Sequence, residues 1–412
     1  SIAQNASSSC ASADGSYTIS GVSFGSLDEL MIFIDGEPAS GVTVSKDPIS
    51  SIADMDVYEN HVIARHENTN PLTIADLAVW DSSDDADIPY TATVGTPDTL
   101  TIAADTKLLL WSGKTFEPQG DVTVAGGGAG AAYDGSVEAL ANATFVGAPG
   151  ESHSIGGSFE FAPTAGFAAN GAAFDFTTDD AGRSITVGSA AFADATFSGS
   201  GSWIITDAES TVTGDLTVTG GNLTLANGTT TIGGSLQNSA GLNTNSGLLS
   251  FSATSGSEVV TLGGSSAADI EFIGNAAWTM TDTNATATES FRVATGSVTL
   301  PSGVLSVGGD FIVADTISAN GGTLALRQAS GEATLTLSGN DLASVVQTGG
   351  ATTTMTDSAA TFLGDLTVAS GTFAVATDTL SIGGSLDAVN GVLGVGDRLA
   401  LGNLPHESLT FF

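Results

Sequence analysis

The chain has 412 residues, with 45 aspartates and glutamates against 8 lysines and arginines, so its formal net charge is -37. Nucleic acid is not expected as a partner, because there is no basic surface to displace counterions from phosphates. Membrane insertion is not expected either, because the chain has no apolar run of about 18 residues.

The surface is predicted to be neutral and the chain to be extracellular or at a cell surface. Hydrophobic residues make up 41% of the chain, which is too many for disorder. Charged residues are only 13%, so serine, threonine, asparagine and glycine must cover most of the surface, as in secreted scaffolds. Aromatics are 7%, which predicts a core of small aliphatic side chains. Because the chain starts at Ser1 without Met, we expect a signal segment to have been removed, with a fragment of a larger protein as the alternative.

The first 96 residues are expected to hold a leader and a compact β-domain. Residues 1–16 are small and polar, and could act as a leader or as a donor strand added to another chain. Residues 17–96 contain short apolar runs separated by turn residues, which predict a small, immunoglobulin-like β-sandwich. Asp35-Gly36 is a hairpin signal between two of these runs. The runs are 17–22, 30–34, 41–45, 55–58, 61–65, 72–80 and 88–94.

An acidic loop at the end of this domain is the main candidate for a metal site. It contains Asp81, Asp84, Asp85 and Asp87. Carboxylates this close together could coordinate Ca²⁺, although their spacing does not fit an EF-hand. The alternative is a solvated interdomain loop. Asp179-Asp180 is a weaker candidate of the same kind.

The remaining chain repeats with a period of 75 residues. Gly-Gly pairs begin at 233, 308 and 383, and Thr-Asp pairs at 206, 281 and 356. TGDLTV at 213–218 returns as LGDLTV at 363–368. Landmarks that share one period indicate a repeat architecture. QGDVTV at 119–124 marks a divergent first copy.

Residues 97–396 are therefore predicted to form a β-solenoid or parallel β-helix of four units, followed by a tail over 397–412. A unit of 75 residues suits four coils of about 19 residues, with glycine-rich corners between strands of four to six residues. The rival interpretation is a row of tandem sandwich domains, but no proline-bearing linker marks a joint. The unit boundaries are about 97–172, 173–247, 248–322 and 323–396.

This texture resembles that of large bacterial and archaeal surface β-solenoid proteins, such as adhesins, S-layer-like proteins and surface-filament subunits. The resemblance covers about residues 97–396 and depends on runs such as GDLTVTGGNLTLANGTTTIGGSL. It implies a surface location and a scaffolding or adhesive role, and it brings no functional residues with it.

The sequence offers little catalytic chemistry. The four histidines, His61, His66, His153 and His406, form no metal motif and are expected at the surface. No carboxylates and bases converge at one repeat position, as a polysaccharide-cleaving β-helix enzyme would need.

Two sets of residues recur at the 75-residue period. Asp207, Asp282 and Asp357 are expected to form a column that caps corner N–H groups, with calcium as the alternative. Trp203 and Trp278 recur one unit apart and are expected in the core; a glycan-binding surface stack is the alternative.

We therefore expect a non-enzymatic structural subunit of an extracellular filament or surface layer that assembles with copies of itself. Solenoid ends expose strand edges, and the tail brings Leu409, Phe411 and Phe412 as apolar assembly residues. Cys10 cannot form an intrachain disulfide because it is the only cysteine, but it could link two subunits. The alternative is an adhesin stalk whose N-terminal domain binds surface glycans or neighbouring cells. A polysaccharide-active enzyme is a third, less favoured function.

Overall fold

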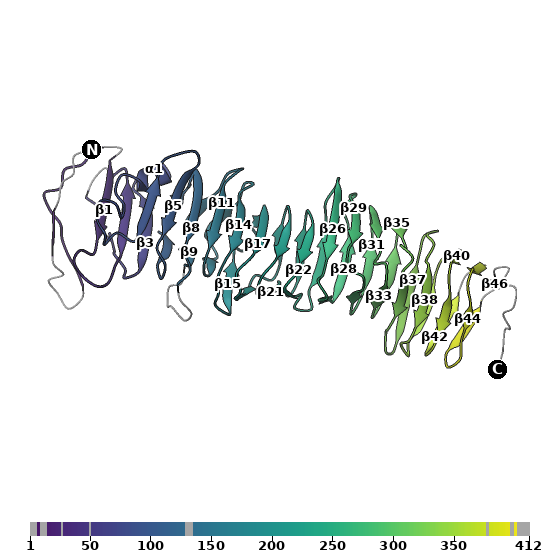
Figure 1. Cartoon of the computed structure of the whole chain (residues 1–412). Helices are drawn as coiled ribbons and strands as arrows, with labels where there is room; N and C mark the ends of the chain where they lie inside the picture. The colour runs from purple at the N-terminus through teal and green to yellow at the C-terminus, as the bar shows by residue number, and fades with distance from the viewer. Residues whose placement is uncertain are drawn as a thin grey trace. The chain divides into compact units, whose positions relative to one another are not determined.

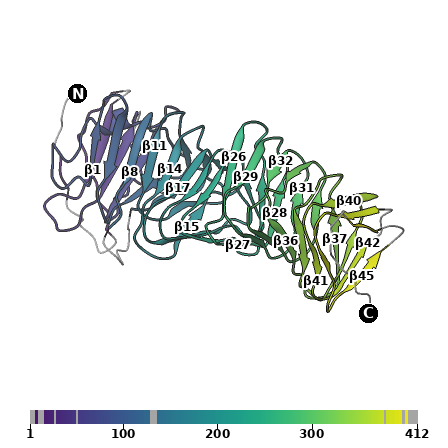
Figure 2. The same ribbon diagram turned by 45° about the vertical axis from the view of Figure 1, so that its right-hand side comes forward.

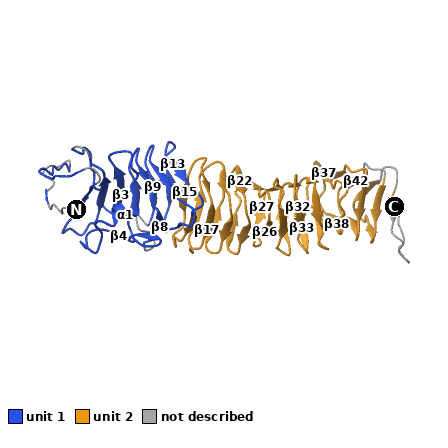
Figure 3. Cartoon of the chain, turned by 90° about the horizontal axis from the view of Figure 1, so that it is seen from above, with its two compact units in different colours: residues 1–172 blue, residues 173–412 orange. Residues whose placement is uncertain are grey.

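The computed structural model describes residues 6–8, 15–25, 28–48, 51–127, 135–375, 379–395 and 399–401. It divides into two compact units, residues 1–172 and residues 173–412 (Figure 3). The chain is all-β with almost no helix, and it winds a β-solenoid of about 17 turns. The predicted all-β solenoid is confirmed.

Unit 1 consists of short strands and one helical turn. Its elements are β1 (Glu29–Phe33), β2 (Val42–Lys46), β3 (His61–His66), α1 (Ile74–Leu77), β4 (Tyr90–Thr93), β5 (Asp98–Ile102), β6 (Lys107–Leu110), β7 (Thr115–Phe116), β8 (Gly120–Val124), β9 (Val137–Ala139), β10 (Thr144–Val146), β11 (Ser152–Ile155), β12 (Phe159–Phe161) and β13 (Gly166–Ala168).

The first strands of unit 1 belong to the solenoid sheets. Strand β2 pairs in parallel with β3, β3 with β6, β6 with β9, and β9 with β12. A second sheet runs from β5 through β8 to β11, and a third contains β7, β10 and β13. A separate N-terminal sandwich is not confirmed, because β2 and β3 continue the stacked sheet that contains β6. In Figure 1 these strands lie one behind another in the purple and blue part of the chain.

The elements at the start of these sheets differ from the solenoid strands. Strand β1 pairs antiparallel with β2, and β4 pairs antiparallel with β5. Beside the third sheet, Leu72 forms a bridge to Phe116. Helix α1 follows at once, held by the capping box of Thr73 and Asp76. Two of the sheets therefore begin with a strand that reverses the direction of the parallel stack.

Four of the seven expected runs correspond to strands. These are 30–34, 41–45, 61–65 and 88–94, which overlap β1, β2, β3 and β4. The hairpin at Asp35-Gly36 connects β1 and β2 as expected. The run 72–80 is not a strand, because the Thr73–Asp76 capping box starts helix α1 within it. Residues 17–22 and 55–58 form no strand.

Figures 1 and 2 show the stacked turns of unit 2. Its strands form three faces, with three strands to every turn but one; in that turn the first face has only the isolated bridge between Leu342 and Phe362. The first face contains β14 (Ala173–Phe176), β17 (Asp194–Phe197), β20 (Leu216–Val218), β23 (Leu236–Asn238), β26 (Ser257–Thr261), β29 (Ala277–Met280), β32 (Ser297–Thr299) and β35 (Thr316–Ser318), and then β40 (Ala359–Phe362), β43 (Thr379–Ile382) and β46 (Leu399–Leu401).

The second face begins with one group of strands and continues with another. It contains β15 (Arg183–Thr186), β18 (Ser202–Ile205), β21 (Asn222–Thr224) and β24 (Gly241–Asn243), and then β27 (Ser266–Ala267), β30 (Ala285–Ala287), β33 (Val304–Val307), β36 (Thr323–Leu326), β38 (Ser344–Gln347), β41 (Leu366–Val368) and β44 (Leu386–Asp387).

The third face is one continuous sheet. It contains β16 (Ala191–Phe192), β19 (Ser210–Val212), β22 (Thr229–Ile232), β25 (Leu248–Phe251), β28 (Asp269–Phe272), β31 (Phe291–Val293), β34 (Phe311–Val313), β37 (Glu332–Thr336), β39 (Thr352–Met355), β42 (Thr372–Val375) and β45 (Val392–Val395).

The 75-residue period is not a whole number of turns. Strand β29, which contains Trp278, is the eleventh strand after β18, which contains Trp203. With three strands per turn, this interval is three and two-thirds turns, so the repeat moves to another face each time. Thr353, the third copy, lies in β39 on the remaining face. The division into four units of four whole coils is therefore not confirmed.

The 75-residue period is nevertheless visible in the number of residues between paired positions of successive turns. Most paired residues in successive turns are about 20 positions apart, as Leu216 and Leu236 are. Leu236 and Val260 are 24 positions apart. Phe311 and Leu335, each one period later, are also 24 apart. One longer turn therefore recurs with the sequence repeat.

The core of unit 2 contains ladders of aromatic rings as well as aliphatic side chains. Phe251 stacks on Phe272 with ring centroids 4.9 Å apart. Phe291 and Phe311 stack at 5.3 Å with an interplanar angle of 9°. The prediction of a core made of small aliphatic side chains is therefore only partly correct. The few phenylalanines of the sequence are placed inward at successive turns, where paired strands bring identical side chains together.

Candidate functional site

The richest polar chemistry in the described residues lies on the outer face of β3 and β6 in unit 1. In β3, alternation directs His61 and Arg65 to one side and His66 to the other. Although they lie on the outer face, His61 and Arg65 are buried. Part of the cover comes from the segment before β3, because the Asp54 carbonyl oxygen accepts a 2.8 Å hydrogen bond from Nη1 of Arg65.

Glu67 binds several of the polar side chains in this region. Its Oε1 accepts hydrogen bonds from Nε of Arg65 at 2.7 Å and from Oγ of Ser45 at 2.8 Å. Its Oε2 lies 3.5 Å from Nζ of Lys114. Burial by itself would raise the pKa of Glu67, but the hydrogen bonds and nearby cations hold that pKa below its usual value.

An aromatic ring lies against the Arg65 guanidinium. Its Cζ lies 5.6 Å from the centroid of the Trp111 ring, within the range of a cation–π contact. The Tyr58 ring lies 6.3 Å from Trp111 and 5.7 Å from His61, measured between centroids. Lys107 and Glu138 form a 2.7 Å ion pair from the adjacent strands β6 and β9. We call Tyr58, His61, Arg65, Lys107, Trp111 and Glu138 the aromatic cluster.

The prediction that the histidines lie at the surface is wrong for the three that the structure describes. His61, His66 and His153 are all buried, and burial lowers the pKa of each one. Nδ1 of His66 contacts the Asn68 carbonyl at 2.6 Å, and its Nε2 accepts a hydrogen bond from the Thr115 amide. His406 lies outside the described residues.

The four carboxylates of the acidic loop do not all lie together in the structure. Asp81 is buried and accepts hydrogen bonds from the Ser83 hydroxyl and the Ala92 amide. Asp84 accepts from the Asp81 amide. These two carboxylates therefore stabilise the turn itself.

Asp85 and Asp87 lie close to a third carboxylate, unlike Asp81 and Asp84. They join Asp35, a residue that the sequence did not suggest, so that one carboxylate oxygen of each lies within 4.8 Å of the others. The Asp87 carboxylate also accepts a 2.7 Å hydrogen bond from the Gly36 amide. The predicted calcium site remains a prediction, with its candidate ligands now narrowed to these three.

The recurrent aspartates of unit 2 cap corners, as predicted. Asp207 accepts hydrogen bonds from the amides of Val187 and Gly188, which lie one turn earlier. Asp282 and Asp357 make the same pair of hydrogen bonds to earlier corners. They do not form a column, because they follow β18, β29 and β39 on three different faces.

The two recurrent tryptophans are core residues, as predicted. Trp203 and Trp278 are 0% and 1% exposed. The Trp203 ring contacts Phe197, and the Trp278 ring lies near Phe251 and Phe272. A surface stack of tryptophans is therefore ruled out at these positions.

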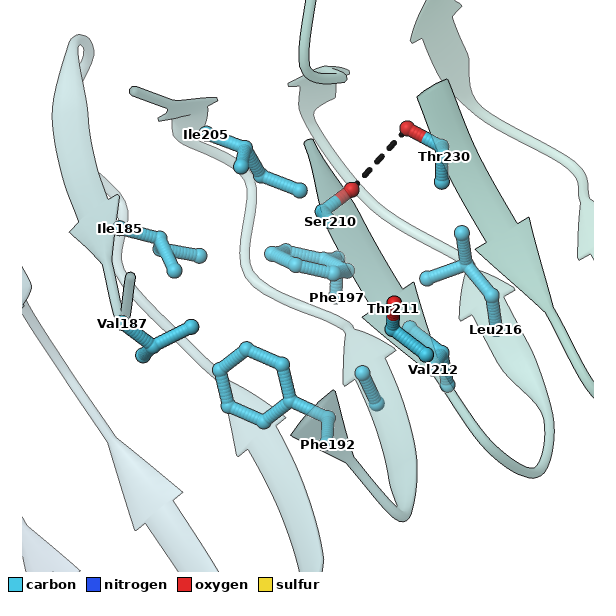
Figure 4. Close-up of a pocket in the computed structure, with 11 residues that line it drawn as sticks. Ile185, Val187, Phe192, Phe197, Ile205, Ser210, Thr211, Val212, Leu216 and Thr230 are labelled. Carbon is cyan, nitrogen blue, oxygen red and sulfur yellow. Dashed lines mark hydrogen bonds between the residues drawn. The ribbon is translucent and has the colours of Figure 1, made fainter. Parts of the chain in front are cut away.

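A small interior cavity in unit 2 is shown in Figure 4. Its volume is about 10 Å³, enough for about one water molecule. Phe192, Phe197 and Val212 point into it, and the Ser210–Thr230 hydrogen bond lies at its edge. It is a gap between core side chains of adjacent turns and is too small for an organic ligand.

The residues predicted to mediate assembly, Cys10, Leu409, Phe411 and Phe412, lie outside the described residues. No helix in the described part of the chain is long and apolar enough to cross a membrane. Comparison with protein-family models, with curated proteins and with solved structures finds no match to this chain.

Proposed function

We propose that this chain is a non-enzymatic structural subunit of an extracellular filament or surface layer, and that copies of it associate through its termini and the ends of the solenoid. The observation that carries the proposal is a difference between sheet edges. In unit 1, two of the sheets begin with strands that run antiparallel to their neighbours, β1 and β4, so the parallel stacking does not extend to these first strands. The last described strands of unit 2, β44, β45 and β46, each end a sheet in parallel register.

Parallel edge strands are templates for pairing with another chain. No further described strand pairs with the outer edge of β45. Its Val392 is 59% exposed, and Val389, just before it, is also exposed. In the proposed assembly a neighbouring copy would cover these apolar side chains and pair with these edges.

Charge sets the conditions for association. Six of the eight basic residues are paired with carboxylates: Lys46, Arg65, Lys107, Lys114, Arg183 and Arg292. The excess negative charge opposes contact between copies, so salt and divalent ions should favour assembly.

The test is assembly of the full chain in salt and calcium, followed by light scattering and negative-stain microscopy. Val392→Asp adds a charge to an edge strand and should slow assembly. The matched control is Ile204→Asp, because Ile204 is also exposed but lies in β18, which is paired on both sides. Deletion of residues 1–16, or separately of 405–412, tests the termini.

Two outcomes would contradict the proposal in different ways. If both truncations assemble like the parent, the termini are not the joint. If the parent stays monomeric in salt and calcium, the alternative of an adhesin stalk is favoured. The aromatic cluster in unit 1 is the observation that supports this second candidate.

A further inference from the structure

Tyr58 is an aromatic side chain displayed to solvent on a tightly constrained piece of backbone. Among the described residues it is the one aromatic with a large exposed fraction, 41%. Monomeric proteins usually display such rings singly and without consequence. Here, however, the ring belongs to a cluster with a second aromatic and several polar side chains.

The backbone around Tyr58 leaves little room for movement. A β-carbon on Gly41 would collide with the Tyr58 carbonyl oxygen, so the two segments approach as closely as glycine allows. The Asn60 amide donates to the Ser40 carbonyl at 2.6 Å, and Asn60 itself has a φ of 57°. A ring presented from such a turn loses little backbone entropy when it binds a ligand.

Trp111 is held in place by the Arg65 side chain and by a backbone hydrogen bond to β3. The Arg65 guanidinium lies against its ring and is itself fixed by hydrogen bonds to Glu67 and to the Asp54 carbonyl. The Trp111 amide also donates to the Ala64 carbonyl at 3.1 Å. Trp111 remains partly exposed beside Tyr58, and the two rings meet at an angle of 42°.

Polar groups that can bind hydroxyls lie on the adjoining strands. Lys107 and Glu138 form an ion pair and are both partly exposed, so the pair offers donors and acceptors together. Each charge is neutralised by its partner. Arg65 and Lys114 are likewise paired with Glu67. The cluster therefore lacks the unpaired cation that an acidic ligand would need.

We propose that Tyr58 and Trp111 form a binding site for a neutral glycan built of β-linked, equatorially substituted sugars. Such a sugar ring presents axial C–H groups on a flat face, and these are attracted to the negative face of an aromatic ring. The Lys107–Glu138 pair, on the adjoining strands β6 and β9, would supply a donor and an acceptor for hydroxyls of the glycan. Sites of this kind combine aromatic surface with a few placed polar groups. The site does not depend on the assembly proposal.

The test measures binding of the full chain to cellohexaose and chitohexaose, with hexagalacturonate as an acidic comparator. We expect the parent to bind the neutral sugars and to prefer them to hexagalacturonate. Tyr58→Ala should weaken binding about three- to tenfold, the usual value of one aromatic contact. Tyr58→Phe keeps the ring and should bind like the parent. Ligand-induced fluorescence changes should disappear in Trp111→Phe.

Val94→Ala is the matched control, because Val94 is an exposed apolar residue of unit 1 outside the cluster. It should leave binding unchanged, and melting temperatures should show that all variants fold. The proposal is overturned if the parent binds neither neutral sugar, or binds hexagalacturonate at least as tightly. It is also overturned if a folded Tyr58→Ala variant binds like the parent.

Discussion

Trp203 and Trp278 are 75 positions apart in the sequence, and both indole rings are buried although they lie on different faces of unit 2. The repeat therefore specifies an inward position on a strand and not a fixed side of the solenoid. Each copy meets a similar environment because every face supplies the same layered interior. Phenylalanine rings lie near the indole in both cases.

The third copy of the repeat, which has threonine at the tryptophan position, suggests a direct test of the inward packing of these rings. Trp278→Thr introduces the residue that stands at the equivalent position 353, where Thr353 is buried. The change should destabilise unit 2 by about 3–5 kcal/mol, as large-to-small core changes of tryptophan do. Thermal or urea unfolding measures the effect. A stability equal to that of the parent would mean that the ring is not a packing residue.

The corner aspartates give a second prediction. Asp282→Ala leaves the amides of Leu262 and Gly263 without their acceptor, and should cost about 1–2 kcal/mol. Asp282→Asn retains one acceptor oxygen and should lie between alanine and the parent. Glu209→Ala removes an exposed carboxylate and serves as the control in urea unfolding. Equal losses for Asp282→Ala and Glu209→Ala would contradict a capping role.

The sequence was sufficient to predict the all-β solenoid, the corner caps and the buried tryptophans. Each depends on a short pattern that recurs, such as the Thr-Asp pair at 206, 281 and 356. The face on which each copy lies could not be predicted, because the 75-residue repeat does not reveal how many residues form one turn of the solenoid. A difference of one residue per turn would move a later copy to another face.

The N-terminal strands and the aromatic cluster were harder to predict for a different reason. Local patterns located β2 and β3 but could not reveal that β2 pairs in parallel with β3, or that β3 pairs in parallel with β6, which begins about 45 residues after β3 does. The Thr73–Asp76 capping box was the missed signal for α1. Tyr58, Arg65 and Trp111 come from separate segments, so no motif in the sequence joins them.

Calcium binding at the acidic loop is the third prediction. A divalent cation held by Asp35, Asp85 and Asp87 would relieve their mutual repulsion and raise the melting temperature. Asp85→Asn should reduce that gain. Asp84→Asn, at a carboxylate that caps the Asp81 amide, should lower stability equally with and without calcium. An unchanged melting temperature when EDTA is added to calcium-loaded protein would exclude the site.

The last prediction concerns acid and the buried His153. Burial lowers the pKa of His153 to about 4, from its usual 6.5, and its Nδ1 accepts a hydrogen bond from the Val122 amide. The unfolded chain therefore binds a proton between pH 6.5 and 4 that the folded chain does not, so stability falls as the pH falls through this range. The full effect is about 3 kcal/mol.

Two carboxylates near His153 alter the size of this loss. Asp121 acts in the direction that raises the pKa of His153. Oε2 of Glu151 lies 3.4 Å from Nε2 of His153, and burial raises the pKa of Glu151. Uptake of a proton by the folded Glu151 would offset part of the loss of stability in acid.

His153→Asn supplies a neutral acceptor and should flatten the dependence of unit 1 stability on pH between 6.5 and 4. Urea unfolding at several pH values measures the slope, and an unchanged slope in His153→Asn would assign the acid sensitivity to other groups.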